Sequence, residues 1–156
     1  IEVKPTDTAY VYLGALMEKA NDIEGSIASF KEAIALNKGN LKAYQNLCTV
    51  YVKQKRFDEA IDFLMSSLEE QKKNKFLLNA LAGIYVEKGG KEEAIKVLES
   101  NISKDNSPIN INMMVNLASL YSEKGNRAKA RDIMENALSL KPSNLEFIKK
   151  KLEEFS

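Results

Sequence analysis

The sequence lacks most of the residues on which catalytic and metal sites depend. It contains no histidine, no tryptophan and a single cysteine, Cys48. Without histidine, a Ser-His-Asp triad, a Cys-His pair, a histidine-ligated metal and imidazole acid–base chemistry are excluded. One cysteine forms neither an internal disulfide nor a cysteine-based zinc site, and its place in the pattern below favours a buried, inert thiol. We therefore expect no enzyme activity, no catalytic residue, no cofactor and no metal.

An excess of charge of one sign and long apolar runs are also missing. The 23 Lys and Arg residues and 22 Asp and Glu residues are interspersed, with a formal net charge of +1. Phosphate binding needs a concentrated basic surface, so we expect no nucleic-acid partner. No apolar run approaches the roughly 18 residues of a membrane span, so we expect no membrane insertion by this segment.

The compartment is not assigned by the sequence. A fold with one cysteine does not depend on an oxidising environment, which slightly favours the cytoplasm. The chain begins with Ile1 rather than Met, so the removal of an N-terminal signal, anchor or further domain stays open.

The sequence does contain one helical pattern four times. Leu13 recurs as Leu47, Leu81 and Leu117, at intervals of 34, 34 and 36 residues. Each of these leucines is followed by a small residue and, four positions on, by Met or Tyr. Such spacing predicts amphipathic helices, and the fixed period predicts a solenoid whose units bury their apolar faces by stacking.

The pattern predicts four helix–turn–helix units and a terminal helix, forming a single domain over residues 1–156. The units are expected at about 7–40, 41–74, 75–108 and 111–144, with a capping helix at about 145–155. Each unit has small residues where its two helices must approach closely, such as Gly14 in the first.

Four local features are predicted from turn and cap chemistry, from the repeat spacing and from the sequence triplet 101–103. Gly39 is expected to end the second helix in a left-handed conformation. Ser143 and Glu146 are expected to form a capping box that opens the last helix, whose apolar face includes Leu145 and Ile148. The 36-residue step predicts a longer connection at residues 105–110. The glycosylation-type triplet 101–103 is expected inside a helix, where a structural role is favoured.

The repeat resembles the tetratricopeptide repeat (TPR), with its aromatic-x2-Leu-Gly-x2-Tyr, Ala-x3-Phe-x2-Ala and Pro pattern. The residues of the fourth unit that carry the resemblance are Leu117, Ala118, Tyr121, Gly125, Ala130, Ala137 and Pro142. The resemblance implies an all-α fold, a right-handed α–α superhelix of antiparallel helix pairs. It also implies a non-catalytic scaffold or adaptor that binds a protein or peptide partner in the concave groove.

Residues opposite the core stripe of each first helix are expected to line that groove. Those selected as the peptide-binding site are Tyr12, Lys42, Gln45, Asn46, Thr49, Phe76, Asn79, Asn112 and Asn116. An Asn side chain pairs with both the N–H and the C=O of a passing backbone. Asn46 and Asn116 match an asparagine ladder of the resembling family, which Tyr12 and Ala80 interrupt, so retention of Asn as a common repeat residue stays open. Phe76 suggests apolar anchoring.

Other functions remain as alternatives. A structural assembly or self-association module would act through the exposed first repeat or the convex face. RNA recognition of the pentatricopeptide type is disfavoured by the 34-residue steps and the absence of a basic groove. A clamp for chaperone C-terminal carboxylates is disfavoured because Val11, Ala15, Phe76 and Ala80 occupy the positions of its charged and polar groups. An enzyme whose active site lies outside this segment stays open.

Overall fold

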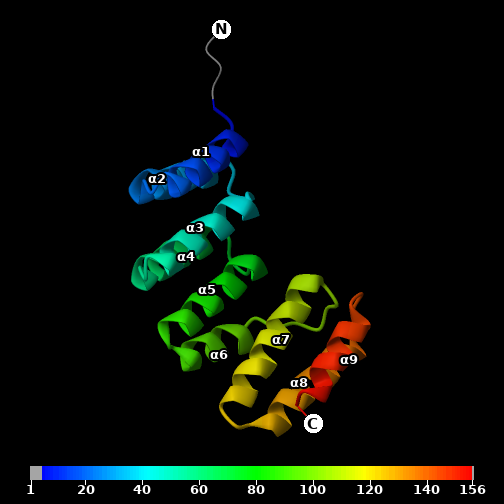
Figure 1. Ribbon diagram of the computed structural model, residues 1–156. Coiled ribbons are helices and arrows are strands. Elements are labelled where there is room, and N and C mark those ends of the chain that lie inside the picture. The colour runs from blue at the N-terminus through cyan, green and yellow to red at the C-terminus, as the bar shows by residue number, and fades with distance from the viewer. Residues whose placement is uncertain (1–4, 156) are drawn as a thin grey trace. The chain divides into compact units, whose positions relative to one another are not determined.

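The computed structural model describes residues 5–155, and in that range the protein is all-α, as predicted (Figure 1). The helices of the described range are α1 (Asp7–Lys19), α2 (Ile23–Leu36), α3 (Leu41–Lys53), α4 (Phe57–Glu70), α5 (Lys75–Lys88), α6 (Lys91–Glu99), α7 (Pro108–Glu123), α8 (Arg127–Ser139) and α9 (Leu145–Glu153). The chain forms two compact units, unit 1 (Ile1–Phe63) and unit 2 (Leu64–Ser156). The expectation of a single domain stays a prediction.

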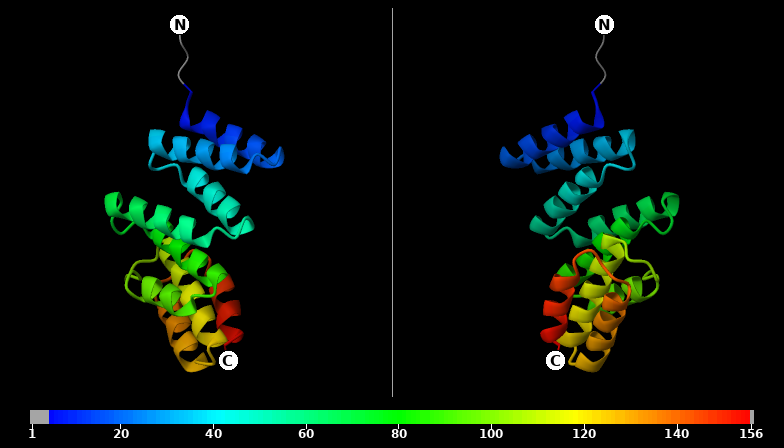
Figure 2. Two further views of the ribbon diagram at one scale, coloured as in Figure 1. Left: turned by 90° about the vertical axis from the view of Figure 1, so that its left-hand side faces the viewer. Right: turned by 90° about the vertical axis from the view of Figure 1, so that its right-hand side faces the viewer.

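In unit 1, α1 and α2 lie side by side and run in opposite directions, and α2 packs on α3 (Figures 1 and 2). The close approach depends on Gly14, because a Cβ there would lie 2.7 Å from Cε1 of the buried Phe30. Thr6 caps α1 by accepting a hydrogen bond of 3.1 Å from the backbone N–H of Ala9. The predicted helix start and the predicted small residue at the helix contact are therefore confirmed.

In unit 2, α5 packs with α6, α7 packs with α8, and α9 packs on α8. Figure 1 shows α5 to α9 following one another along this unit. Ile148 of α9 is fully buried in a cluster with Met134 and Ala137 of α8. The last helix therefore covers the apolar face of the fourth repeat, as expected. Leu145, predicted on the same face, is instead 38% exposed at the start of the helix.

Two of the predicted helix-end features are wrong. The second helix ends at Leu36, and Asn37 follows it in an extended conformation with φ of −145°. Gly39 is not among the described residues with positive φ, so the chain leaves α2 through extended backbone. Asn144 directly precedes α9 and forms no side-chain cap bond. Ser143 therefore lies one residue too far upstream to form the expected capping box.

The connection between α6 and α7 also differs from the prediction. Helix α6 ends at Glu99, so the triplet 101–103 lies in the connection rather than inside a helix. Asn101 donates its side-chain N–H to the Val97 carbonyl at 2.7 Å, the acceptor that its backbone N–H would use if the helix continued. Helix α7 starts at Pro108, so the inserted residues 109 and 110 form its first turn.

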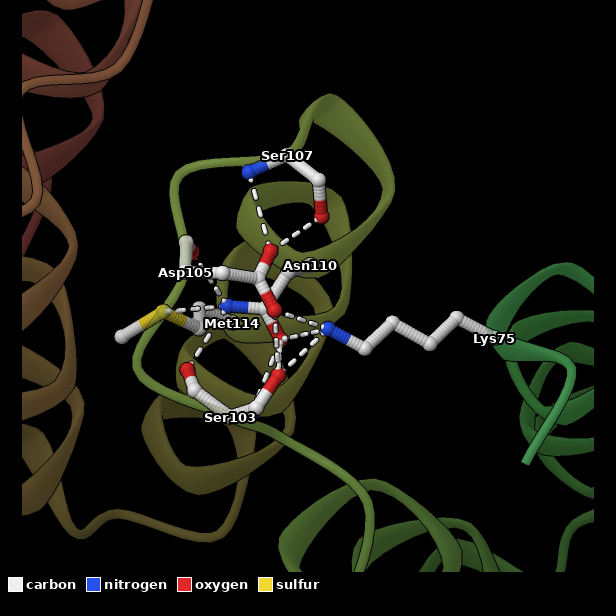
Figure 3. Close-up of polar contacts among 6 residues, drawn as sticks. All are labelled: Lys75, Ser103, Asp105, Ser107, Asn110 and Met114. Atoms are coloured by element: carbon white, nitrogen blue, oxygen red, sulfur yellow. Dashed lines mark hydrogen bonds and ion pairs between the residues drawn. The ribbon is translucent and has the colours of Figure 1, made fainter.

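The buried side chain of Asn110 forms hydrogen bonds that hold this connection in place (Figure 3). Its amide nitrogen donates to the carbonyls of Ser103 and Asp105 at 2.8 Å each. Its Oδ1 accepts from the Ser103 backbone N–H at 3.0 Å and from Lys75 Nζ at 3.2 Å. Lys75 also forms an ion pair with Asp105. The two-residue insertion thus supplies an amide that joins the connection to the start of α5.

Candidate functional site

The first helices of unit 2, α5 and α7, pack against each other and bring two of the predicted asparagines together. Asn116 Nδ2 donates a hydrogen bond of 2.9 Å to Asn79 Oδ1. That bond uses one donor of Asn116. The side-chain oxygen of Asn116 and the side-chain amino group of Asn79 take no part in it. The amide chemistry expected of a peptide-binding surface is therefore present between two neighbouring helices.

An open hollow of about 250 Å³ lies beside this pair. We call it the Gly83 hollow, and its lining residues are Gly83, Val86, Glu87, Leu98, Asn116, Ser119, Leu120 and Glu123. Val86 is half-buried and supplies apolar surface next to the buried Leu98 and Leu120, whereas Glu87 and Glu123 are exposed. The hollow thus combines an apolar floor with polar and acidic side chains, as binding sites commonly do.

Gly83 leaves one side of the hollow open. A Cβ built at this position meets no heavy atom within 4 Å. Gly14 occupies the interior of a first helix too, but there the packing of Phe30 requires the missing side chain. Gly83 therefore has no packing partner that explains it, and it exposes the backbone of α5 to an approaching molecule.

The charges around the hollow are only partly balanced. Glu123 forms an ion pair of 2.7 Å with Lys91 Nζ. Among the described lining residues, Glu87 adds a second carboxylate and no cationic side chain is present. Ser119 donates its hydroxyl to the Val115 carbonyl at 3.0 Å, which leaves its oxygen as an acceptor. The hollow is therefore an acidic environment of net negative charge.

The other predicted site residues are distributed over both units. Phe76 is half-buried on α5 and Asn112 is exposed on α7. In unit 1, Tyr12 on α1 is 73% exposed. On α3, Asn46 is half-buried, and the exposed predicted residues are Lys42, Gln45 and Thr49. Their shared role in binding stays a prediction.

Val11, which occupies one of the positions compared with the carboxylate clamp, is buried. It lies three residues before Gly14, so it shares the stripe of α1 that faces α2.

Several residues of the Gly83 hollow were not selected from the sequence. Val86 and Glu87 follow Asn79 by seven and eight residues, and Glu123 follows Asn116 by seven, so extending the same helix faces by two turns would have included them. Leu98 belongs to α6, a second helix, and no first-helix pattern indicates its contribution.

The first helix of unit 1 exposes two leucines, of which the pattern placed Leu13 in the core. Leu13 is 39% exposed and Leu16 is 64% exposed. Their counterparts in the other repeats are all buried: Leu47, Leu81 and Leu117, and Val50, Ile84 and Leu120. In a stack of repeats the second helix of one repeat covers the first helix of the next, as α2 packs on α3 and α6 packs on α7, whereas the described residues contain no helix before α1. The core assignment of Leu13 is therefore wrong for the first repeat alone.

A larger hollow, of about 510 Å³, was not expected from the sequence. It is lined by Met114 of α7, by Ile102 in the α6–α7 connection and by Asn136 and Leu140 at the end of α8. Met114 and Asn116 are two residues apart on α7, so this hollow opens on the opposite face from the Gly83 hollow.

The chemistry of other sites is limited in the described part of the chain. Burial raises the pKa of Cys48 to about 11, which keeps the thiol protonated at neutral pH. Residues 5–155 contain no group of three His, Cys, Asp or Glu side chains placed to hold a metal ion. In the same range, no helix has both the length and the apolar character to cross a membrane.

The helix pairs and their stacking define an all-α helical repeat protein. Two sequence profiles described as tetratricopeptide repeat match residues 17–75 and 111–144. Together these matches extend over more than half of the chain, and the chain belongs to the tetratricopeptide repeat family. The sequence matches no curated protein.

Solved structures agree on the fold. A thermophilic TPR protein from Thermus thermophilus is 18% identical, with a TM-score of 0.62 over 96% of this chain and 81% of that chain. PilF of Pseudomonas aeruginosa is 19% identical, with a TM-score of 0.69 over 96% of this chain and 67% of that chain. The Cut9–Hcn1 hetero-tetramer of APC/C is 17% identical, with a TM-score of 0.62 over 97% of this chain and 30% of that chain. At these identities the likeness extends to the fold alone.

Proposed function

We propose that this protein is a non-catalytic adaptor that binds an extended peptide segment or a helix of a partner protein on the first-helix faces of its repeats. TPR folds are in general protein–protein interaction modules. The observation that carries the proposal is the Asn79–Asn116 pair beside the open Gly83 hollow. It offers backbone-pairing groups and a recess for one side chain on a single face.

The pair is suited to a peptide because both kinds of hydrogen-bonding group are present. The Asn116 oxygen accepts from a backbone N–H, and the Asn79 amino group donates to a backbone C=O. Main-chain pairing gives affinity for many sequences, and the adjacent hollow then selects a side chain. One relative in fold, Cut9–Hcn1, is described as a hetero-tetramer, which is in keeping with a role in protein assembly.

The test compares partner capture by the wild-type protein and by an Asn79→Ala/Asn116→Ala variant, using lysate of the source organism. A matched control, Asn106→Ala, changes the same side chain at an exposed position of the α6–α7 connection. The proposal predicts a protein retained by the wild type and the control and lost by the double variant. Each protein must first show the same thermal unfolding. Equal retention by all three would contradict binding on this face.

A second function, assembly through α1, is favoured by a separate observation. Leu13 and Leu16 expose the apolar stripe that every other first helix buries. A face of this kind is suited to a helix packed as the second helix of a repeat packs. This reading makes the protein a stacking module, with a second copy or another helical repeat as its partner.

A further inference from the structure

We infer that the Gly83 hollow binds a lysine or arginine side chain of the bound segment. This inference rests on the proposed binding face and specifies its ligand. Three features of the hollow carry it: an apolar floor, an acidic rim and an unobstructed approach over α5.

The floor matches the aliphatic part of a long basic side chain. Leu98 and Leu120 are buried, and Val86 is half-buried beside them. The methylene stems of Lys and Arg pack along apolar surface while their charged ends remain near water. A short polar side chain would leave this floor uncovered. The ligand side chain therefore needs both length and an apolar stem.

The rim selects the charge at the end of that side chain. Glu87 and Glu123 line the hollow, and Lys91 is paired with Glu123. The ion pair balances one carboxylate, which leaves Glu87 as the group for an incoming cation. An acidic side chain would meet like charge in the same place, and such contacts are unfavourable at interfaces. Arg has the added advantage of a planar group that pairs with a carboxylate through two hydrogen bonds.

The approach to the hollow is open because residue 83 has no side chain. A Cβ at this position meets nothing within 4 Å, so the space above α5 is free for a partner backbone. The Asn79–Asn116 pair lies on the same two helices, next to this opening. A peptide backbone held by the amides thus passes over Gly83, with one side chain entering the hollow.

The test selects binders from a displayed library of random twelve-residue peptides and measures their affinity by fluorescence anisotropy. We expect binders enriched in Arg or Lys at one position, with binding that weakens as salt increases. Replacing that residue by citrulline or glutamine, or introducing Glu87→Gln, should weaken binding by about 2- to 5-fold, the range of an exposed ion pair. Asp132→Asn removes the same charge from the exposed surface of α8 and should leave affinity unchanged.

The outcomes separate this inference from the proposed function. Binders that require Asn79 and Asn116 but show no Arg or Lys enrichment would overturn the inference and leave the proposed function standing. Basic peptides equally weakened by Glu87→Gln and Asp132→Asn would indicate general charge attraction, and they would overturn it too. Failure to select any binder that depends on the two asparagines would contradict both.

Discussion

Gly14 and Gly83 both lie inside first helices, but the absence of a side chain has a different physical cause at each position. Gly14 lies where α1 and α2 touch, and a Cβ there would overlap Phe30. Gly83 lies on an open surface, where a Cβ would touch nothing within 4 Å. Glycine destabilises a helix interior relative to alanine, so the first is explained by packing within the protein. No packing contact explains the second, and the proposed function assigns it to the approach of a partner.

The two glycines give a matched pair of stability predictions. Gly83→Ala should raise the free energy of unfolding by about 0.5–1 kcal/mol, because alanine restricts the unfolded chain and fits the folded one. Gly14→Ala should lower it by about 1–3 kcal/mol through overpacking. Urea denaturation measures both. A destabilising Gly83→Ala would show that this position is packed and would remove the argument for an open approach.

Asp105 predicts a pH-dependent contribution to stability. The ion pair with Lys75, together with hydrogen bonds from Ser103 and Ser107, holds the pKa of this carboxyl well below its usual value of 3.8. A carboxyl with a lowered pKa in the folded state stabilises the protein above its unfolded pKa, and this stabilisation is lost as pH falls through the folded pKa.

The measurement compares wild type with Asp105→Asn by urea denaturation at pH 6, 4 and 3. Wild type should be the more stable protein at pH 6, and the difference should shrink below about pH 4, near the ordinary pKa of Asp. A difference that is constant over this range would mean that the Asp105 charge does not stabilise the fold. Asp132→Asn serves as the control for removing an exposed carboxylate.

At the scale of elements, α1 differs from the other first helices in what covers it. The stacking surface that repeats bury within the chain is exposed at Leu13 and Leu16. If this surface binds a second copy, sedimentation should show dimers that increase with concentration. A Leu13→Ser/Leu16→Ser variant should remain monomeric with unchanged helicity. A wild-type monomer at all concentrations would exclude self-association through α1.

The sequence predicted the helix pairs well because their contacts are local and periodic. Small residues at fixed spacing, such as Gly14 against Phe30, are required wherever two helices of one repeat touch. The α6–α7 connection could not be predicted in the same way. Its conformation depends on Asn110, whose amide binds Lys75, a residue 35 positions away. No repeat pattern contains that pairing, and the first turn of α7 replaced the expected loop.

The candidate site was also predicted only in the part that depends on helical spacing. Helical spacing placed Asn79 and Asn116 on the outward faces of α5 and α7, and the two side chains are in contact. The hollow beside them also requires Leu98, which reaches it from α6. A reading of first helices alone therefore predicts the amides but not the recess or its acidic rim.

For the whole molecule, the two units offer different surfaces to a partner. Unit 1 contains the first helices α1 and α3, and unit 2 contains α5 and α7. The proposed binding face lies in unit 2, where the amide pair and the hollow occur together. A partner that binds α1 instead would use a different surface of the protein. The position at which a partner contacts the chain therefore distinguishes peptide binding on unit 2 from assembly through α1.

Site-specific photocrosslinking locates that contact directly. A benzophenone side chain is placed at Asn112, one turn before Asn116, and separately at Leu16 and at Asp132, and each protein is irradiated in lysate of the source organism. We expect a discrete crosslinked partner from position 112 and none from position 132. Crosslinks from position 16 alone would transfer the function to the α1 surface. Crosslinks from position 132 alone would contradict binding on the first-helix face.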